Sequence, residues 1–508
     1  MNVVSKILFI CVDAADKDLL ISWTETGLLP TFRSLLEKGA WGSTTNPPGL
    51  FVGAVWPSFY TGVSPARHGR YCYSQIRPGS YDSFSFKPSD VKWEPFWNVL
   101  GRAGRRVAII DVPKTFPSEN LNGIQMVDWG THDPDLGFCT WPPSLALEVE
   151  AKFGQDPVGK CDRTGRSLAE FKVLREALVA RVGKKADLAA YYLEQGGWDC
   201  FLTVFSESHC VGHQCWHLHD PAHPRHDAAV ARALGDPIKD VYIAIDAAIG
   251  RLLERVGSET IVFILASHGM GPHYDGTFLL GEILRRLENA QLSPGRRRAG
   301  DFLRWCWDRT PLGLHKLLRP VRNRIRNRLG ETLPTTEIVG SRKSFRVTNN
   351  DAYGGIRINL VGREPYGRIR PGAEYAAFCE ELSRDLLALI NLDAGEPLVR
   401  RVLRTADLYR GEHIDDLPDL LVEWNRETPI SSVYSPKTGT IQGEYRGNRT
   451  GDHKPEGLFF ALGPSIRPGH LERPVSVTDF APTVASLLGV PLPDVDGVPI
   501  APLFARDY

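Results

Sequence analysis

Three short apolar segments of the chain each end directly in polar residues. They are Lys6–Val12, Cys200–Thr203 and Thr260–Ala266. Apolar runs of this length are typical of strands that are buried on both faces of a parallel sheet. Because the carboxyl ends of parallel strands meet at one edge of a sheet, the pattern predicts that the polar residues after these strands lie together.

The residues that follow these predicted strands are of the kind that bind metals. Asp13 follows the first run and His268 the third, whereas His209 and His213 follow the second. His209 and His213 are four positions apart, so in a helix they share one face and form a chelating pair. One histidine at a strand end is more often structural, but three such ends favour a metal site. Imidazole with carboxylate suits zinc.

The rest of the chain alternates between predicted helices and strands. Residues 96–113 are typical of a helix, a turn and a strand, and residues 236–256 of an amphipathic helix. Segment 127–133, which includes His132, is another strand end, and we interpret it as a solvated loop. The pattern predicts an α/β fold with a doubly wound, mostly parallel sheet and helices on both faces.

A smaller unit and an insert are predicted to interrupt this core. Strands expected at 353–361, 398–404 and 419–424, with a helix over 373–392, suit a small α+β cap. The expected divisions are a first part of the core at 1–285, a basic helical insert at 286–345, the cap at 346–431 and a closing part of the core at 432–508.

The insert is rich in arginine. Within residues 295–330, Arg322 and Arg326 are four apart and share a helical face, and tryptophan and leucine residues lie between the basic positions. Such charge runs are usually the solvated face of a helix. The alternative is a basic amphipathic segment that meets an anionic surface or a polyanion. Both interpretations stay open.

The overall composition argues against several classes of partner and location. Lys plus Arg and Asp plus Glu both number 60, so no overall charge favours nucleic acid or a membrane surface. Nine cysteines without CxxC spacing argue against a disulfide framework and for a reducing compartment. No segment approaches the 18 or so apolar residues that a membrane span requires. We therefore expect a cytoplasmic protein without a transmembrane segment.

Several motifs together resemble those of a known family. They are Asp13 after a strand, WPSFYTGVSPARHG at 56–69, SHGM at 267–270, GDH at 451–453, and the closing stretch 476–497. In this order they are similar to the type I phosphodiesterase and nucleotide pyrophosphatase branch of the alkaline phosphatase superfamily. The resemblance covers nearly the whole chain, although residues 286–431 match only the looser bacterial members.

The resemblance implies one or two divalent metal ions, commonly zinc. The first ion would be held by His209, His213 and His453, and the second by Asp13, Ser267 and His268. The family has aspartate at the positions of His209 and Ser267, so this chain has lost two carboxylates that would neutralise the ions. A site of three histidines remains chemically sound for zinc.

The nucleophile of the family is also replaced. The family places a threonine or serine two residues before the proline that corresponds to Pro57, and Val55 stands there. Ser58 and Thr61 are the nearby hydroxyls. If a helix starts near Pro57, Ser58 could be activated by a metal and by free backbone N–H groups, or it could simply cap the helix. Attack by water that zinc has activated is the other mechanism.

The resemblance implies metal-dependent hydrolysis of small-molecule phosphate esters, with phosphodiesters first. Sulfate esters are disfavoured, because the Cys-x-Pro-Ser-Arg signature of sulfatases is absent. Two alternatives are kept. One is a metal-binding protein of the same fold that has lost turnover, and the other is a transferase that moves a phospho-headgroup to a sugar or lipid, for which the basic insert would be the clue.

Overall fold

The protein is described here by a computed structural model in which residues 6–288 and 339–504 are placed. The arginine-rich segment predicted at 295–330 lies outside these described residues. Within them, no helix is both long enough and apolar enough to cross a membrane.

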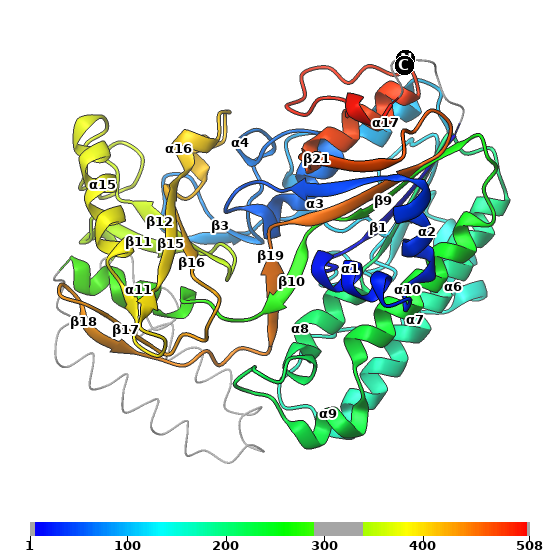
Figure 1. Ribbon diagram of the computed structural model, residues 1–508. Coiled ribbons are helices and arrows are strands. Elements are labelled where there is room, and N and C mark those ends of the chain that lie inside the picture. Colours follow the sequence, from blue (N-terminus) through cyan, green and yellow to red (C-terminus); the bar gives the residue numbers. More distant parts are fainter. Residues whose placement is uncertain (1–5, 289–338, 505–508) are drawn as a thin grey trace.

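A nine-stranded sheet forms the centre of the larger unit, in the order β21-β2-β20-β9-β1-β8-β5-β6-β7 (Figure 1). Seven strands run in one direction, and only β20 and β7 oppose them. The strands are β1 (Lys6–Val12), β2 (Ala40–Thr45), β5 (Val107–Ile110), β6 (Gly123–Val127), β7 (Cys139–Trp141), β8 (Cys200–Phe205), β9 (Thr260–Ala266), β20 (Gly457–Leu462) and β21 (Gly469–Ser476).

Helices cover both faces of this sheet (Figure 1). On one face lie α1 (Lys17–Glu25), α2 (Pro30–Lys38), α6 (Leu145–Phe153), α7 (Leu168–Glu194), α8 (Glu207–His219) and α10 (Pro237–Leu253), and on the other α3 (Phe51–Thr61), α5 (Phe96–Arg102) and α17 (Phe480–Leu487). Alternate side chains of β1 pack into the two cores: Leu8 and Ile10 into one, Ile7 and Phe9 into the other. Burial on both faces explains why the strand is apolar throughout, and the predicted doubly wound α/β fold is confirmed.

A smaller unit lies beside the core and contains two antiparallel sheets (Figure 1). The first has the order β11-β12-β16-β15, and the second β14-β13-β17-β18. Its elements are α11 (Thr277–Leu287), β11 (Ser344–Val347), β12 (Tyr353–Ile358), α15 (Ala373–Leu387), β13 (Ile390–Asn391), β14 (Glu396–Pro397), β15 (Val399–Arg404), β16 (Leu420–Trp424), β17 (Ser432–Ser435) and β18 (Gly439–Gln442). Helices α11 and α15 share one apolar cluster with these sheets.

Two short strands connect the units and lead to the edge of the central sheet. Strand β10 (Gly269–Pro272) follows β9 and pairs antiparallel with β19 (Gly451–Lys454), so that Met270 lies opposite His453. The remaining short elements are α4 (Pro65–His68), β3 (Ser74–Ile76), β4 (Ser83–Ser85), α9 (Ala228–Leu234) and α16 (Thr405–Leu408), with 3₁₀ turns at Pro88–Asp90, Ile414–Asp416, Val477–Asp479 and Ala501–Leu503.

Helix α3 differs from the sequence expectation. It begins at Phe51 rather than near Pro57, so the proline lies inside the helix. Proline there cannot donate the usual hydrogen bond to the carbonyl of Gly53, which disfavours a helix. The apolar side chains from Phe51 to Trp56 are largely buried, and their burial outweighs the lost bond. The start of α3 is therefore decided by the burial of its apolar side chains, and the expected start near Pro57 is wrong.

Close packing of α8 against β19 depends on a glycine. A Cβ atom at Gly451 would lie 2.3 Å from the carbonyl oxygen of Gly212 in α8, too close for any side chain. We expect Gly451→Ala to lower the free energy of unfolding by about 1–3 kcal/mol, because overpacking forces the backbone apart. Thermal or denaturant unfolding of the purified protein measures this change.

Gly281→Ala in α11 is the matched control. A Cβ atom there meets nothing within 4 Å, so the helix should become more stable by about 0.5–1 kcal/mol. Equal stability of the two variants would show that the α8–β19 contact can relax at no cost.

Candidate metal centre

The structure brings together the residues that follow the central strands. Asp13 follows β1, and Ser267 and His268 follow β9. His209 and His213 lie on α8, directly after β8, because strand and helix are joined by Ser206 alone. Strand β19 adds a residue from near the C-terminus, His453, by pairing with β10.

The two helix histidines face each other. His209 Nε2 lies 3.0 Å from His213 Nε2. The opposite nitrogens of the two rings are held by oxygen atoms: His209 Nδ1 lies 2.6 Å from Asp13 Oδ2, and His213 Nδ1 lies 2.8 Å from the carbonyl oxygen of Gly451. Each ring is therefore fixed at Nδ1 and presents Nε2 to its neighbour.

Proton positions follow from these partners. A carbonyl oxygen only accepts hydrogen bonds, and so does an ionised carboxylate, so both Nδ1 atoms must donate. Burial by itself raises the pKa of Asp13, but the charge and hydrogen bond of His209, with further effects of His268 and His132, lower that pKa to about 2. The Asp13 side chain is thus a carboxylate, and both Nε2 atoms present lone pairs to each other.

These facing lone pairs need a cation. Burial, with Arg449 and the neighbouring histidines, holds the pKa of His213 well below its usual value, and burial with His132 lowers the pKa of His209. Neither ring therefore gains a proton near neutral pH, and two lone pairs at 3.0 Å repel each other. Neutral imidazole is the form that binds metals, so a divalent ion between these rings would satisfy both nitrogens.

Two more imidazoles complete the group. The ring centroid of His453 lies 4.7 Å from the centroids of His209, His213 and His268. His453 Nε2 is buried and has no hydrogen-bond partner, whereas His453 Nδ1 lies 3.1 Å from His268 Nε2. Burial lowers the pKa of His268 to about 4, so this ring is also neutral. We call His209, His213, His268 and His453 the four-histidine cluster.

Carboxylates are scarce around the cluster. Asp13 Oδ2 is bound to His209, and the other oxygen, Oδ1, accepts a hydrogen bond of 3.1 Å from the indole nitrogen of Trp56. Ser267 Oγ lies 2.9 Å from His268 Nδ1 and 3.5 Å from Asp13 Oδ1. A neutral hydroxyl at this position offsets no positive charge. The donor set, rich in nitrogen, fits one ion of the zinc type better than two close ions.

The two candidate hydroxyls are both engaged elsewhere. Ser58 Oγ lies 3.0 Å from His68 Nε2, and His68 Nδ1 accepts the backbone N–H of Arg70. His68 must therefore donate to Ser58, and burial with the nearby Arg70 lowers the pKa of His68 to about 3. Thr61 Oγ1 donates to the carbonyl oxygen of Pro57. Among the described contacts, neither hydroxyl reaches the four-histidine cluster.

The first turn of α3 also contains no hydroxyl. Its sequence is Phe-Val-Gly-Ala, at positions 51–54. The ring of Phe51 approaches His268 at a centroid distance of 6.0 Å, so this turn lies beside the cluster. The helix start that would present a nucleophile is therefore apolar in this chain.

His132 is a neighbour of the cluster that the sequence interpretation missed. We expected segment 127–133 to be a solvated loop, but the His132 side chain is buried and stacks on His209 at a centroid distance of 3.9 Å. Nearby, Arg449 pairs with Asp133 at 2.9 Å and Asp162 at 2.7 Å. The signal was present, since this is a fourth strand that ends in polar residues.

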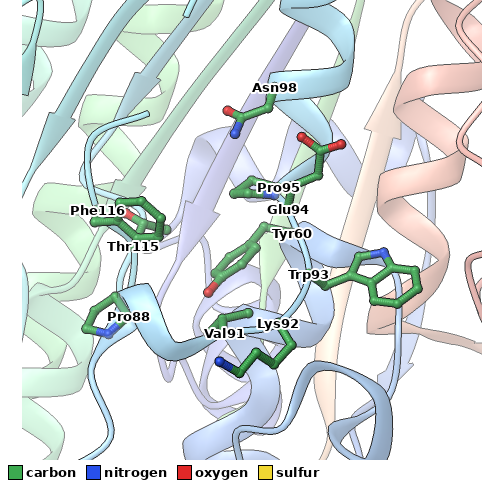
Figure 2. Close-up of a pocket in the computed structure, with 10 residues that line it drawn as sticks. All are labelled: Tyr60, Pro88, Val91, Lys92, Trp93, Glu94, Pro95, Asn98, Thr115 and Phe116. Carbon is green, nitrogen blue, oxygen red and sulfur yellow. The ribbon is translucent and has the colours of Figure 1, made fainter. Parts of the chain in front are cut away.

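A separate cavity opens beside α3. Its volume is about 260 Å³, and aromatic rings of Tyr60, Trp93 and Phe116 are prominent in its lining (Figure 2). None of the metal-binding candidates lines it. The cavity is thus distinct from the four-histidine cluster.

The fold defines a class. A mostly parallel sheet with helices on both faces is the alkaline phosphatase-like α/β architecture. Residues 7–453 match the family described as type I phosphodiesterase/nucleotide pyrophosphatase, and the chain belongs to this family. No curated protein sequence matched the chain.

Solved structures agree with this fold. Murine ectonucleotide pyrophosphatase/phosphodiesterase 5 is 13% identical with a TM-score of 0.51, covering 98% of this chain and 100% of that chain. Its inactive threonine-to-alanine variant in complex with AMP is 12% identical with a TM-score of 0.50, covering 99% and 100%. Phosphonoacetate hydrolase from Sinorhizobium meliloti, in complex with phosphonoformate, is 13% identical with a TM-score of 0.52, covering 96% of each chain. At such identities the likeness shows a shared fold.

The geometry of the cluster predicts which histidines bind metal. His213→Ala should lose a tightly bound transition metal and keep the fold, because it removes one of the two facing lone pairs. Elemental analysis with circular dichroism of the purified variant measures both properties. His219→Gln is the matched control on the same helix, since His219 pairs with Asp236 outside the cluster. Equal metal content in the wild type, His213→Ala and His219→Gln would contradict the proposed metal centre.

Proposed function

We propose that the protein is a metal-dependent hydrolase of phosphate esters and that phosphodiesters are its preferred substrates. Family membership supports the reaction class. The observation that most supports metal dependence is the pair of lone pairs on His209 and His213, which face each other at 3.0 Å in a buried site.

In this proposal one zinc ion is held by His209, His213 and His453. The imidazole whose donor atom lies within 4.8 Å of those of His209 and His213 in the structure is His132, so the His453 ring has to move closer when the ion binds. Asp13 and His268 would hold a second ion only weakly, since Ser267 replaces a carboxylate beside them. A bound zinc ion supplies Lewis acidity, which lowers the pKa of water and polarises a phosphoryl oxygen.

The protein's own residues prepare this chemistry. Asp13 keeps a proton on His209 Nδ1, and the Gly451 carbonyl keeps one on His213 Nδ1, so both Nε2 atoms stay available as ligands. Arg449 places a positive charge close enough to lower the pKa of His209, His213 and His453, although burial lowers these values first.

Water is the nucleophile in our proposal. Ser58 accepts a hydrogen bond from His68, which therefore cannot act as its base, and the first turn of α3 has no hydroxyl. A single in-line attack by water inverts the configuration at phosphorus. Double displacement through a serine would retain it and would allow transfer to an added alcohol.

Two variants separate these mechanisms. With bis-para-nitrophenyl phosphate as substrate, we expect Ser58→Ala to stay within a few-fold of the wild-type rate, whereas His453→Ala should lose roughly 100-fold or more, on the order expected for a key catalytic group. A loss of that size in Ser58→Ala, with fold and metal content unchanged, would assign the nucleophile to Ser58. Product stereochemistry with a chiral thiophosphate diester gives an independent answer.

A catalytically silent metal-binding protein is the second candidate. Val55 favours it because it stands at the nucleophile position of the family, and His209 and Ser267 favour it because they replace metal-binding aspartates. A zinc-loaded wild type that hydrolyses no phosphate ester would establish this candidate. The clue to the third alternative, a transferase, lies outside the described residues, and product analysis with an acceptor alcohol tests it. Cytoplasmic location stays a prediction.

A further inference from the structure

We propose that His132, Cys161 and Cys210 form a second metal site, a thiolate site for zinc beside the four-histidine cluster. A ring nitrogen of His132 also lies within 4.8 Å of donor atoms of His209 and His213, so this ring is where the two sites meet. The proposal does not depend on phosphate hydrolysis. It rests on the convergence of one imidazole and two sulfur atoms in the protein interior.

The three donor atoms already lie close together. His132 Nδ1 is 3.0 Å from Cys161 Sγ and 3.3 Å from Cys210 Sγ, and all three donor atoms lie within 4.8 Å of one another. Around a tetrahedral zinc ion, usual bond lengths place nitrogen and sulfur about 3.5 Å apart and two sulfurs about 3.8 Å apart. The two nitrogen–sulfur distances are shorter than this by about 0.5 and 0.2 Å, so small shifts of the imidazole would bring them to the values of a zinc site.

The donors come from three separate parts of the chain. His132 follows β6, Cys161 lies between α6 and α7, and Cys210 lies on α8. All three side chains are buried, with 5%, 4% and 0% of their surfaces exposed. A buried cysteine alone often acts as a small apolar residue. An imidazole nitrogen aimed at two thiols is different, because such a group suits a borderline metal ion.

Charge balance also permits an ion at this place. One Zn²⁺ would replace two protons on the three donor side chains, so the net charge of the interior does not change. Arg181 Nη2 donates to Cys210 Sγ at 3.2 Å and would support the thiolate from outside the metal shell. Arg181 is itself balanced by Glu207 at 2.8 Å and Asp156 at 3.4 Å.

A fourth ligand is within reach. Asp162 Oδ1 lies 4.0 Å from Cys161 Sγ, and its carboxylate is oriented by Gln214 and Arg449. Either this oxygen or a water molecule can complete four-coordination.

The thiolate site would affect the four-histidine cluster by holding the His132 ring in place. His132 stacks on His209 at 3.9 Å, so an ion that fixes the His132 ring also fixes the plane of His209. The ion would further tie the segment around Cys161 to α8. It would thus be a structural ion beside the reactive one.

Cobalt substitution of the full-length protein tests the proposal. Cobalt bound to thiolate gives a strong near-ultraviolet charge-transfer band, which nitrogen and oxygen ligands alone do not give. We expect this band in the wild type and in His213→Ala. Cys161→Ser and Cys210→Ser should each lose both the band and one equivalent of bound metal. Cys215→Ser is the matched control, because Cys215 is likewise buried on α8 but does not belong to the group of three converging donors.

X-ray absorption of the zinc-loaded wild type is a second test, and its result does not depend on whether any variant folds. A sulfur shell at about 2.3 Å supports the thiolate site. Absence of the sulfur shell, or a charge-transfer band that survives in Cys161→Ser and Cys210→Ser, would overturn it. A disulfide between the two cysteines in the freshly isolated protein would overturn it too. These readouts do not involve turnover, so failure of the proposed hydrolase activity leaves them intact.

Discussion

The facing nitrogens of His209 and His213 are the constraint on which the site depends. Two lone pairs at 3.0 Å are unfavourable unless a cation lies between them, and each ring is prevented from turning away by an oxygen acceptor at its other nitrogen. One acceptor, Asp13, directly follows β1, and the other, the carbonyl oxygen of Gly451, belongs to β19, which is far from β1 in the sequence. The central sheet and the β10–β19 ribbon therefore determine the geometry of the histidine pair.

A buried polar network beneath α8 supports the same arrangement. Lys185 on α7 lies 3.0 Å from Asp111, which follows β5, and donates to the carbonyl oxygens of Val204 in β8 and of Gly130 beyond β6. One helical turn earlier, Arg181 binds Glu207 at the start of α8. Burying such charges is favourable only when nearly every donor is satisfied. The network therefore fixes where α8 starts, and with it the position of His209.

Much of the core could be predicted from the sequence, because buried parallel strands have an unmistakable apolar pattern. The ends of β1, β8 and β9 gave Asp13, His209, His213 and His268 from local order alone. His453 required the family resemblance, since β19 is short and its pairing with β10 is a long-range contact. Burial overrode the proline signal in α3. His132 follows a fourth strand that ends in polar residues, but the interpretation of its segment as a solvated loop hid this signal. Cys161 could not be predicted, because it lies between two helices and no local period connects it to α8.

The nitrogen-rich donor set has a consequence for substrate charge. One divalent ion beside the single carboxylate of Asp13 leaves one positive charge, and a singly charged phosphodiester neutralises it. A second ion would leave a large uncompensated positive charge in a buried site. Ser267 contributes no negative charge, and the carboxylates of Asp133 and Asp162 already pair with Arg449. A doubly charged monoester would leave an excess negative charge instead. Replacement of carboxylate by His209 and Ser267 thus fits one ion and a monoanionic diester better than the two-ion arrangement of the family.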